Sequence, residues 1–344
     1  MATRLADVGE FGLIDRIRRI LEPVNRAATI DDRLEVSIGD DAAVWRPLSE
    51  VPQAITTDAL VEGVHFDLLT TSWNDLGWKS LAVNLSDVGA MGADPELGVI
   101  SLGLPKHALV EDIESFFQGI AACAARWRVA IVGGDIVTSP VLTINVTAVG
   151  ACARGQLRRS AGVAGDVLAV TGWLGRSGGG LRLLQQGMSG TLSVGAAGEF
   201  VQAHVRPVPR IEAAACLVEA GLRCAMDVSD GLRGDTGHIC EQSQCAATIE
   251  IDRIALHDGL VAEFGREDAL RLALDGGEDY ELLCAGPESA VLQAANLVRQ
   301  RTGEVLTIIG SLKNRAEGQP LVTLLKAEGS PMDLPPASWD HFRD

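Results

Sequence analysis

Carboxylates recur along this sequence in one setting, at the exit of an apolar run or beside a glycine turn. The set comprises Asp40, Asp41, Asp58, Asp135, Asp227, Asp230, Glu278 and Asp279. Asp and Gly are common turn residues, so each carboxylate taken alone is more simply interpreted as a turn cap. Strand ends, however, are where a scaffold delivers side chains to a ligand, and a neighbouring glycine allows close approach. The repetition favours a shared binding site.

A shared site of this kind implies divalent cations. Carboxylates gathered in one place repel one another unless cations neutralise them, and oxygen ligands without paired His or Cys select Mg²⁺, Mn²⁺ or Ca²⁺. Mg²⁺ is usually held by few protein carboxylates together with substrate phosphates, so several such sites imply a polyphosphate such as ATP. The pattern therefore predicts a phosphotransfer or ATP-cleaving enzyme.

A further carboxylate, Asp87, falls on a predicted helix that begins near Gly77 and cannot continue past Pro95. Ser80, Asn84 and Asp87 line up about 130° away from the apolar side of this helix, at about 100° per residue. The apolar side carries Trp78, Leu81, Ala82, Leu85 and Val88. Because the polar stripe holds a single carboxylate, it does not resemble an ordinary solvated face, and we expect Asp87 to join the site.

Other nucleotide-binding and hydrolytic signatures are absent from the sequence. It contains no G-x-x-x-x-G-K-[ST], no G-x-G-x-x-G after a strand, no protein-kinase catalytic loop and no G-x-S-x-G elbow. The glycine-rich turn from Gly172 to Gly180 could cradle a phosphate at a helix N-terminus, although such a loop alone is weak support.

The elements that must position these residues alternate between strands and helices. Strands are predicted at 35–38, 53–56, 99–104, 130–132, 142–148, 166–171, 224–226, 247–251, 280–284 and 305–309. Helices are predicted at 13–21, where Pro23 ends the helix, and at 77–88, 109–126, 180–186, after 231 and at 290–301. The fold class is therefore α+β, with a domain boundary near Gly150.

Composition limits the class of protein. A chain of 344 residues exceeds the size of one ordinary core, which favours two domains. The net charge of −17 argues against nucleic acid and anionic membranes as partners. Seven cysteines without a C-x-x-C pair favour reduced, buried thiols. With no secretory signal and no apolar run long enough to span a bilayer, we expect a cytoplasmic protein without a membrane partner.

Taken together, these motifs resemble those of the thiamine-monophosphate kinases, nearly end to end. This family shares a superfamily with aminoimidazole ribonucleotide synthetase, selenophosphate synthetase and a hydrogenase maturation factor. The motifs include Gly9-Glu10-Phe11, Gly39-Asp40-Asp41, Thr57-Asp58, Asn84-Leu85-Ser86-Asp87, Gly133-Gly134-Asp135, Arg159-Ser160, Arg206-Pro207, Pro209-Arg210, Asp227-Val228-Ser229-Asp230-Gly231, Gly276-Gly277-Glu278-Asp279 and Trp339-Asp340-His341-Phe342.

The resemblance implies two α/β-type domains. Residues 1–150 would form a metal- and ATP-binding domain whose mixed sheet pairs with a second copy in a homodimer. Residues 151–344 would form a sheet covered by helices and complete the nucleotide and substrate cleft. The implied activity is direct in-line transfer of the ATP γ-phosphoryl group onto thiamine monophosphate, assisted by several Mg²⁺ ions. The phosphate oxygen that attacks is already anionic, so no general base is needed, and charge neutralisation is the main requirement.

The resemblance also assigns roles to residues by motif. The implied magnesium ligands are Asp41, Thr56, Thr57, Asp58, Asp87, Asp135, Asp227 and Asp230. The implied ATP contacts are Gly134, Asp135, Arg159 and Ser229, and the implied thiamine monophosphate contacts are His65, Glu278 and Trp339. Asp87, Asp230 and Arg159 would be the catalytic residues, whereas Arg206 and Arg210 could be structural.

Two alternatives stay open at this point. One is another ATP-cleaving synthetase of the superfamily. Selenophosphate synthetase is disfavoured because the first cysteine is Cys123, and the ribonucleotide synthetase because no Gly-Thr-Lys signature follows Asp58. The other alternative is a nucleotide-binding regulator without activity, which the complete acidic set disfavours.

Overall fold

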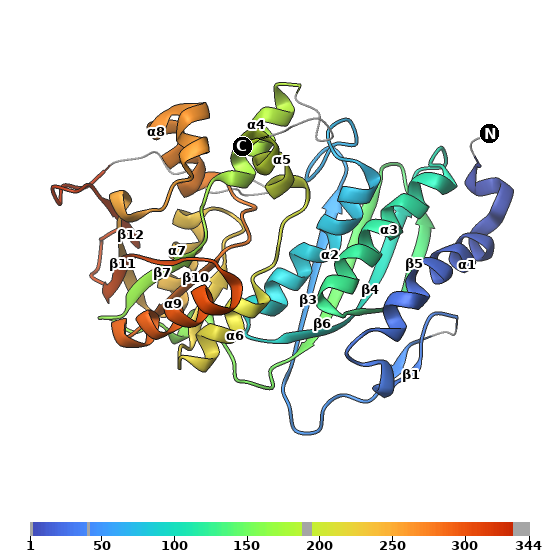
Figure 1. Cartoon of the computed structure of the whole chain (residues 1–344), viewed down its shortest axis with the longest axis horizontal. Helices are drawn as coiled ribbons and strands as arrows, with labels where there is room; N and C mark the ends of the chain where they lie inside the picture. The colour runs from blue at the N-terminus through green and yellow to red at the C-terminus, as the bar shows by residue number, and fades with distance from the viewer. Residues whose placement is uncertain (1–2, 40–41, 188–194, 333–344) are drawn as a thin grey trace. The chain divides into compact units, whose positions relative to one another are not determined.

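The computed structural model describes residues 3–39, 42–187 and 195–332, which form two compact units. The first unit comprises Met1–Val88 and Ala93–Ala153, and the second comprises Gly89–Gly92 and Arg154–Asp344. Each unit has its own main sheet with helices packed on it (Figure 1). The predicted class, two α/β-type units with mixed sheets, is confirmed.

The first unit is built on a four-stranded sheet in the order β3-β6-β4-β5. Its strands are β3 (Gln53–Val61), β4 (Asp94–Leu104), β5 (Ala130–Thr138) and β6 (Thr143–Ala151). All neighbours are antiparallel except β4 and β5, so the sheet is mixed, and β3 and β5 are its two edge strands. Two helices, α2 (Trp73–Ala90) and α3 (Val110–Trp127), cover one face of the sheet (Figure 1).

Helix α2 lies close to both the sheet and α3. A Cβ on Gly77 would lie 1.9 Å from the carbonyl oxygen of Phe116 in α3, and a Cβ on Gly119 would lie 1.8 Å from that of Asn74 in α2. Only glycine therefore permits this crossing of the two helices. Further along α2, side-chain atoms of Leu81 and Val88 lie next to the places where a Cβ on Gly98 of β4 and on Gly150 of β6 would be.

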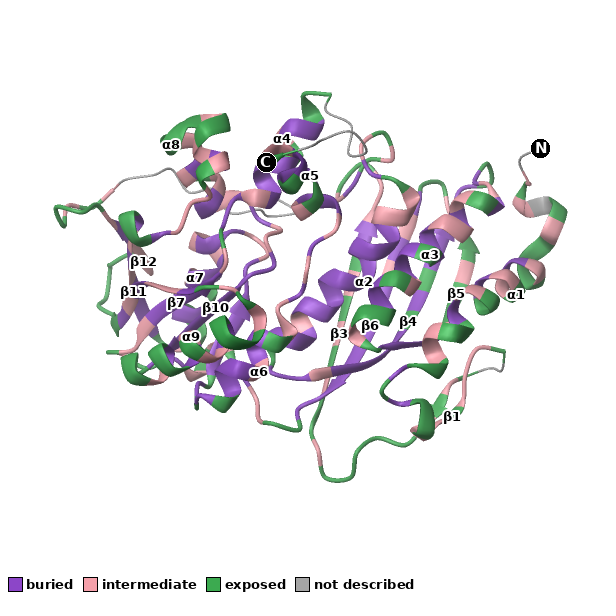
Figure 2. Cartoon of the chain, in the orientation of Figure 1, coloured by how far each residue is buried: buried purple, intermediate pink, exposed green. Residues whose placement is uncertain are grey.

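The periodicity of α2 predicted its packing. The helix begins at Trp73, four residues before the predicted start, and its predicted apolar residues are all buried (Figure 2). The polar stripe is buried as well, since Ser80 is 1% and Asn84 0% exposed. The expectation that this stripe is not a solvated face is confirmed.

The opposite face of the first sheet is covered at one end, where Ala28 and Ile30 pack on Leu97 and Val149, and the rest of that face is open in this chain. Along β6, Leu142, Ile144, Val146 and Ala148 are buried and the residues between them are only partly buried, as the predicted alternation required. On the open face, three apolar side chains are exposed, namely Ile55 at 73%, Val99 at 36% and Val137 at 51%. The sheet therefore has one face on the core and one that is partly available to another molecule.

Helix α1 (Leu5–Arg26) corrects one prediction, because it does not end at Pro23 but includes it. The last turn is held in place by Asn25, whose side chain donates to the carbonyl of Ile131 (2.7 Å) and accepts from its N–H (2.8 Å). These two bonds to β5 compensate for the donor that proline lacks. A kink at Gly9 (φ 67°) divides the helix near its start. The unit also contains η1 (Asp31–Arg33), β1 (Leu34–Val36) and β2 (Val44–Trp45).

The second unit is built on a six-stranded sheet in the order β12-β9-β11-β7-β10-β8. Its strands are β7 (Val167–Thr171), β8 (Cys224–Asp227), β9 (Cys245–Glu250), β10 (Leu282–Gly286), β11 (Leu306–Asn314) and β12 (Val322–Leu325). Its helices are η2 (Arg159–Ala161), α4 (Arg176–Gln185), α5 (Ala196–Val205), α6 (Ile211–Glu219), α7 (Leu232–Gln242), η3 (Ile251–Arg253), α8 (Asp258–Asp275) and α9 (Glu288–Thr302). Only β9 and β12 pair in parallel.

Helices cover both faces of this sheet. Leu168 and Val170 of β7 pack in one apolar cluster with residues of α7 and α8, whereas Ala169 packs in another with residues of α6 and α9. Alternate residues of one strand therefore point into two separate cores, which explains why the strand is apolar throughout.

All seven cysteines are buried and none is in a disulfide, as expected. Among the described residues, no helix is both long enough and apolar enough to cross a membrane.

Candidate active site

In the first unit, strand β3 and helix α2 bring four polar residues together. The hydroxyl of Thr56 donates to the carboxylate of Asp87 (2.6 Å), and the backbone N–H of Asp58 donates to the side-chain oxygen of Asn84 (3.1 Å). Thr56 and Asp58 lie two residues apart on β3, so their side chains share one face, which is the face that α2 covers. The polar stripe of the helix thus faces predicted metal ligands.

Burial and charge act on Asp58 in the same direction. Burial, together with the nearby Asp87 carboxylate, raises the pKa of Asp58 from 3.8 to about 6. Two carboxylates that repel each other in a partly buried place are an arrangement that a bound cation would relieve.

We expect Asp58→Asn to stabilise the metal-free protein at pH 8, measured in the presence of a chelator. Between pH 3.8 and about 6, Asp58 is protonated when folded and ionised when unfolded, so stability falls as pH rises and the full penalty is present above pH 6. A shift of about two pKa units corresponds to at most about 3 kcal/mol. Thermal unfolding should show a higher Tm for the variant at pH 8 and little difference at pH 3.5. An equal or lower Tm at pH 8 would contradict this account.

Two other predicted metal ligands, Thr57 and Asp135, lie on the open face of the sheet. In the register of the sheet, Asp135 pairs with Ser101, Ser101 with Asn145 and Asn145 with Ala59, one position out of step with Asp58. Both Thr57 and Asp135 are exposed. Within one chain, these two side chains therefore do not meet Asp58 and Asp87, and their role stays a prediction.

The expectation that the acidic residues lie at strand exits is wrong for Asp58 and Asp135, which lie inside β3 and β5. Both are edge strands, which continue past the polar residues because pairing with the neighbouring strand continues. The expectation is correct for Asp227, which is the last residue of β8.

Two more predicted residues of the first unit have clear local constraints. His65 lies in the turn after β3, where its Nδ1 accepts from the N–H of Val61 (3.1 Å), which fixes the orientation of the ring. Gly134 lies where β5 approaches β4, and a Cβ there would be 1.9 Å from the carbonyl oxygen of Ile100. A side chain at Gly134 would therefore separate the two strands.

In the second unit, three strand ends bring the remaining predicted residues to one edge of the sheet. Asp227 at the end of β8 pairs with Leu282 at the start of β10, and β10 pairs with the last residues of β7. Beyond these strands the backbone N–H of Glu278 donates to the carbonyl of Ser229 (2.7 Å). The turn that carries Ser229 and Asp230 is therefore paired directly with the turn that carries Glu278.

Glu278 is presented by a backbone that few residues adopt. Its φ is 56°, a left-handed value that is uncommon for residues with a side chain and occurs often at functional sites. Its carboxylate lies 3.4 Å from Nδ1 of the buried His204, which also lies 3.0 Å from the hydroxyl of Ser177. Glu278 is thus fixed at both its backbone and its side chain.

The glycine-rich turn from Gly172 to Gly180 already has an anion at its helix N-terminus. The carboxylate of Asp279 accepts from the N–H of Gly175 (2.6 Å) and of Ser177 (3.0 Å) at the start of α4. Burial raises the pKa of Asp279 to about 7 even though these two donors act in the opposite direction. Because the chain's own carboxylate takes these donors, the turn is not a free phosphate cradle.

Arg210 has a structural partner. Its guanidinium donates twice to Glu281 (2.6 and 2.8 Å), which is 0% exposed, and also pairs with Glu304. The hydroxyl of Thr171 donates to the same Glu281 carboxylate (2.6 Å). This bidentate pair joins the start of α6 to β10, so Arg210 holds the edge of the sheet together.

Of the three remaining predicted residues, the structure describes one, Arg159. Arg159, in η2, is half-buried, and within the described part of the chain its guanidinium has no hydrogen bond or ion pair. Its carbonyl oxygen accepts from the hydroxyl of Ser243 (2.6 Å). Asp41 and Trp339 lie outside the described residues.

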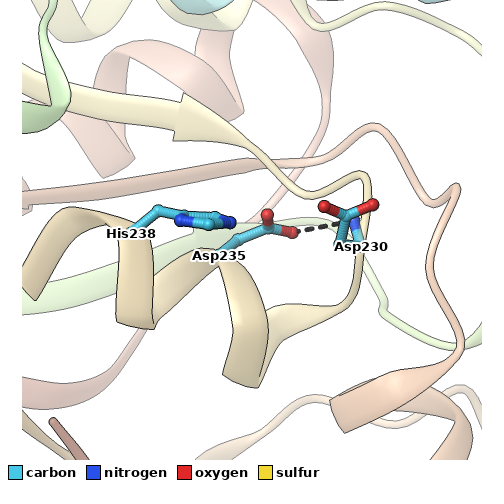
Figure 3. Close-up of side chains that lie close together, drawn as sticks. All are labelled: Asp230, Asp235 and His238. Atoms are coloured by element: carbon cyan, nitrogen blue, oxygen red, sulfur yellow. Dashed lines mark hydrogen bonds between the residues drawn. The ribbon is translucent and has the colours of Figure 1, made fainter. Parts of the chain in front are cut away.

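The structure adds a carboxylate that sequence reasoning missed, Asp235 in the first turn of α7. Asp230, Asp235 and His238 each offer one ligand atom, and these atoms lie within 4.8 Å of one another (Figure 3). Burial, together with Asp230 and Asp227, raises the pKa of Asp235 to about 8. Like Asp58 and Asp87, Asp230 and Asp235 are carboxylates that lie close together, and their oxygen donors fit Mg²⁺.

Comparisons agree with this architecture. The family described as AIR synthase related protein, N-terminal domain, matches residues 39–152, and the C-terminal domain of the same description matches residues 163–322. The two units therefore define a protein of the AIR synthase related class.

Full-length relatives are more specific. Thiamine-monophosphate kinase of Haemophilus influenzae is 35% identical over 98% of this chain and 99% of its own. The crystal structure of thiamine-monophosphate kinase from Stenotrophomonas maltophilia K279a has a TM-score of 0.80 at 36% identity, covering 92% of this chain and 96% of that one. A structure described as AaThiL complexed with AMPPCP and TMP has a TM-score of 0.75 at 31% identity, covering 99% and 100%. The chain belongs to the thiamine-monophosphate kinase family and is an enzyme of that family.

Proposed function

We propose that this enzyme transfers the γ-phosphoryl group of ATP directly onto thiamine monophosphate, giving thiamine diphosphate and ADP. The observation that carries the proposal is the pair of acidic clusters on the two units, around Asp58 and Asp87 and around Asp227 and Asp230. A relative that is 31% identical has been solved with AMPPCP and TMP, and its chain is matched over its whole length. We infer that the oxygen donors of both units take part in the same reaction.

The chemistry of the acceptor suits this set of residues. The attacking phosphate oxygen is an anion at neutral pH, so the protein need not remove a proton. Two like charges about 4 Å apart at an effective dielectric near 20 repel by about 4 kcal/mol, so polyanion repulsion is the main obstacle. Bound Mg²⁺ would supply the charge that offsets it.

The residues of this chain then have separate tasks. Asp58, Asp87, Asp227 and Asp230, with Thr56, would hold the metal ions, and the guanidinium of Arg159 would bind a phosphate oxygen. Ser229 would contact ATP, while Glu278 and His65 would orient the thiamine substrate. Asp41, Thr57, Gly134, Asp135 and Trp339 keep the roles that the resemblance implies.

A coupled assay tests the proposal. Purified enzyme is given ATP, Mg²⁺ and thiamine monophosphate, while ADP and thiamine diphosphate are followed together. Equal amounts of the two products are expected, with none when the thiamine substrate or Mg²⁺ is omitted. ADP formation that depends instead on selenide or on a ribonucleotide would support another synthetase of the superfamily. Binding of nucleotide without any turnover would indicate a regulator.

We also propose that two copies pair through the open face of the first sheet. The exposed Ile55, Val99 and Val137 give this face an apolar character that a second copy would bury. Light scattering during gel filtration should give the mass of two chains, and a mass of one chain at micromolar concentration would contradict the pairing.

The buried, reduced cysteines are consistent with a cytoplasmic location, which we propose as well.

A further inference from the structure

Asp235 makes contacts that an ordinary helix residue does not make. It is 0% exposed, and one of its carboxylate oxygens, Oδ2, accepts from two backbone N–H groups, those of Ser229 (3.0 Å) and Asp230 (3.1 Å). Both N–H groups belong to the turn before α7. A single oxygen therefore fixes the two peptide groups from which the side chains of Ser229 and Asp230 leave (Figure 3).

The backbone explains why this acceptor comes from inside the helix. The N-cap residue of α7 is Gly231, with φ 105°, and a Cβ there would lie 2.7 Å from the carbonyl oxygen of Leu274. No side chain fits at the position where Ser, Asp or Asn usually caps a helix. The N–H groups of Ser229 and Asp230 are instead accepted by a residue that reaches back from inside the helix, Asp235.

This arrangement of Asp235 lowers the free energy of unfolding. The second oxygen of Asp235, Oδ1, is buried and has no hydrogen-bond partner in the described part of the chain. Asp230 and His238 lie close by. A buried oxygen without a partner costs free energy, and ionising a carboxyl group in this buried place costs more, whereas a neutral amide of the same shape carries no such ionisation cost. A purely structural cap would therefore be better served by Asn, and this points to a role in function.

We propose that Asp235 is a positioning residue that holds the Ser229–Asp230 turn in the conformation that binds metal-bound nucleotide. The inference rests on the proposed function, which assigns Asp230 to a metal ion and Ser229 to ATP. Asp235 acts through the two N–H groups, and when it is ionised its negative charge strengthens both hydrogen bonds. Asn at this position keeps the shape and an acceptor but loses the charge.

The test compares Asp235→Asn with the parent enzyme in three measurements. Thermal unfolding without metal should give an equal or higher Tm. Electron paramagnetic resonance of free Mn²⁺, in the presence of a non-hydrolysable ATP analogue, should show Mn²⁺ affinity weakened by about 10-fold or more, as is typical when a residue behind a metal ligand is changed. The Mg²⁺ concentration for half-maximal activity should rise similarly, while KM for thiamine monophosphate changes less than about two-fold.

Two controls separate positioning from packing. Thr236→Val alters the neighbouring buried residue, whose hydroxyl donates to the carbonyl of Leu232 (2.6 Å), without touching the turn. It should leave Mn²⁺ affinity unchanged. Asp230→Asn combined with Asp235→Asn should lose less Mn²⁺ affinity than the sum of the two single losses, because Asp235 acts in part through Asp230.

Several outcomes would overturn the inference. A lower Tm for Asp235→Asn with unchanged Mn²⁺ affinity would show a structural cap only. Additive losses in the double variant would also overturn it. Should Asp235→Asn not fold, the smaller Asp235→Ser undergoes the same measurements with the same criteria. An enzyme without thiamine monophosphate turnover would defeat the proposed function, yet the Mn²⁺ titration would still decide the role of Asp235.

Discussion

Asp87→Asn is expected to lower kcat by about 100-fold or more while leaving the fold intact, a loss comparable to removing one group that stabilises a transition state. The side-chain oxygen of Asn can still accept the hydrogen bond from Thr56, so the local structure has an equivalent partner. Loss of the charge also removes a source of repulsion on Asp58. Turnover of thiamine monophosphate and thermal unfolding, measured on the same preparation, check both parts.

Asp75→Asn is the matched control, because Asp75 lies in the first turn of the same helix and is hydrogen-bonded to Ser72. It should retain kcat. An Asp87→Asn enzyme with the parent kcat would remove this end of α2 from the site, and an unfolded variant would show that Asp87 is needed for the structure.

Arg210→Met is expected to destabilise the second unit by about 3–5 kcal/mol, the usual cost of leaving one partner of a buried ion pair alone. Glu281 is 0% exposed and would lose both hydrogen bonds from Arg210, keeping the hydroxyl of Thr171 (2.6 Å) and the more distant Arg176 (3.8 Å). Urea unfolding followed by circular dichroism should show the transition at markedly lower urea. Activity should fall only as far as the folded fraction falls.

Two comparisons show whether the buried charge is the cause. Arg301→Met breaks an ion pair with Glu219 at the surface and should unfold near the parent's midpoint. Arg210→Met combined with Glu281→Leu removes both charges and should recover much of the lost stability. No recovery in the double variant would mean that packing by the guanidinium, and not the stranded carboxylate, causes the loss.

Periodic patterns in the sequence predicted the parts of the fold that depend on one face being buried. The apolar side of α2 and the alternation along β6 are both correct, because each period reports which residues face the core. The boundaries are less accurate where polar residues lie inside an element. Thr57 and Asp58 look like the end of a strand, yet β3 continues to Val61, since Thr57 lies on the open face and Asp58 faces the polar stripe of α2.

Local patterns in the sequence could not predict contacts between segments that are far apart along the chain. Nothing local indicates that Asp279 occupies the N-terminus of α4, because the partners Gly175 and Asp279 are 104 residues apart. Asp235 was missed because its role depends on the unusual backbone of Gly231, which brings the preceding turn back over the helix. For the predicted site, the spacing of the motifs identified which residues are candidates. Only the register of the sheet shows on which face Asp135 lies.

The buried cysteines of each unit can be used to measure how often that unit opens transiently. Cys123 and Cys152 belong to the first unit, whereas Cys216, Cys224, Cys240, Cys245 and Cys284 belong to the second. An alkylating reagent in excess would modify a given thiol only during the moments when its surroundings unfold, so mass spectrometry of the tagged peptides would measure the two opening rates independently. If nucleotide binds to one unit alone, it would slow alkylation of the thiols in that unit and leave the alkylation rate in the other unit unchanged.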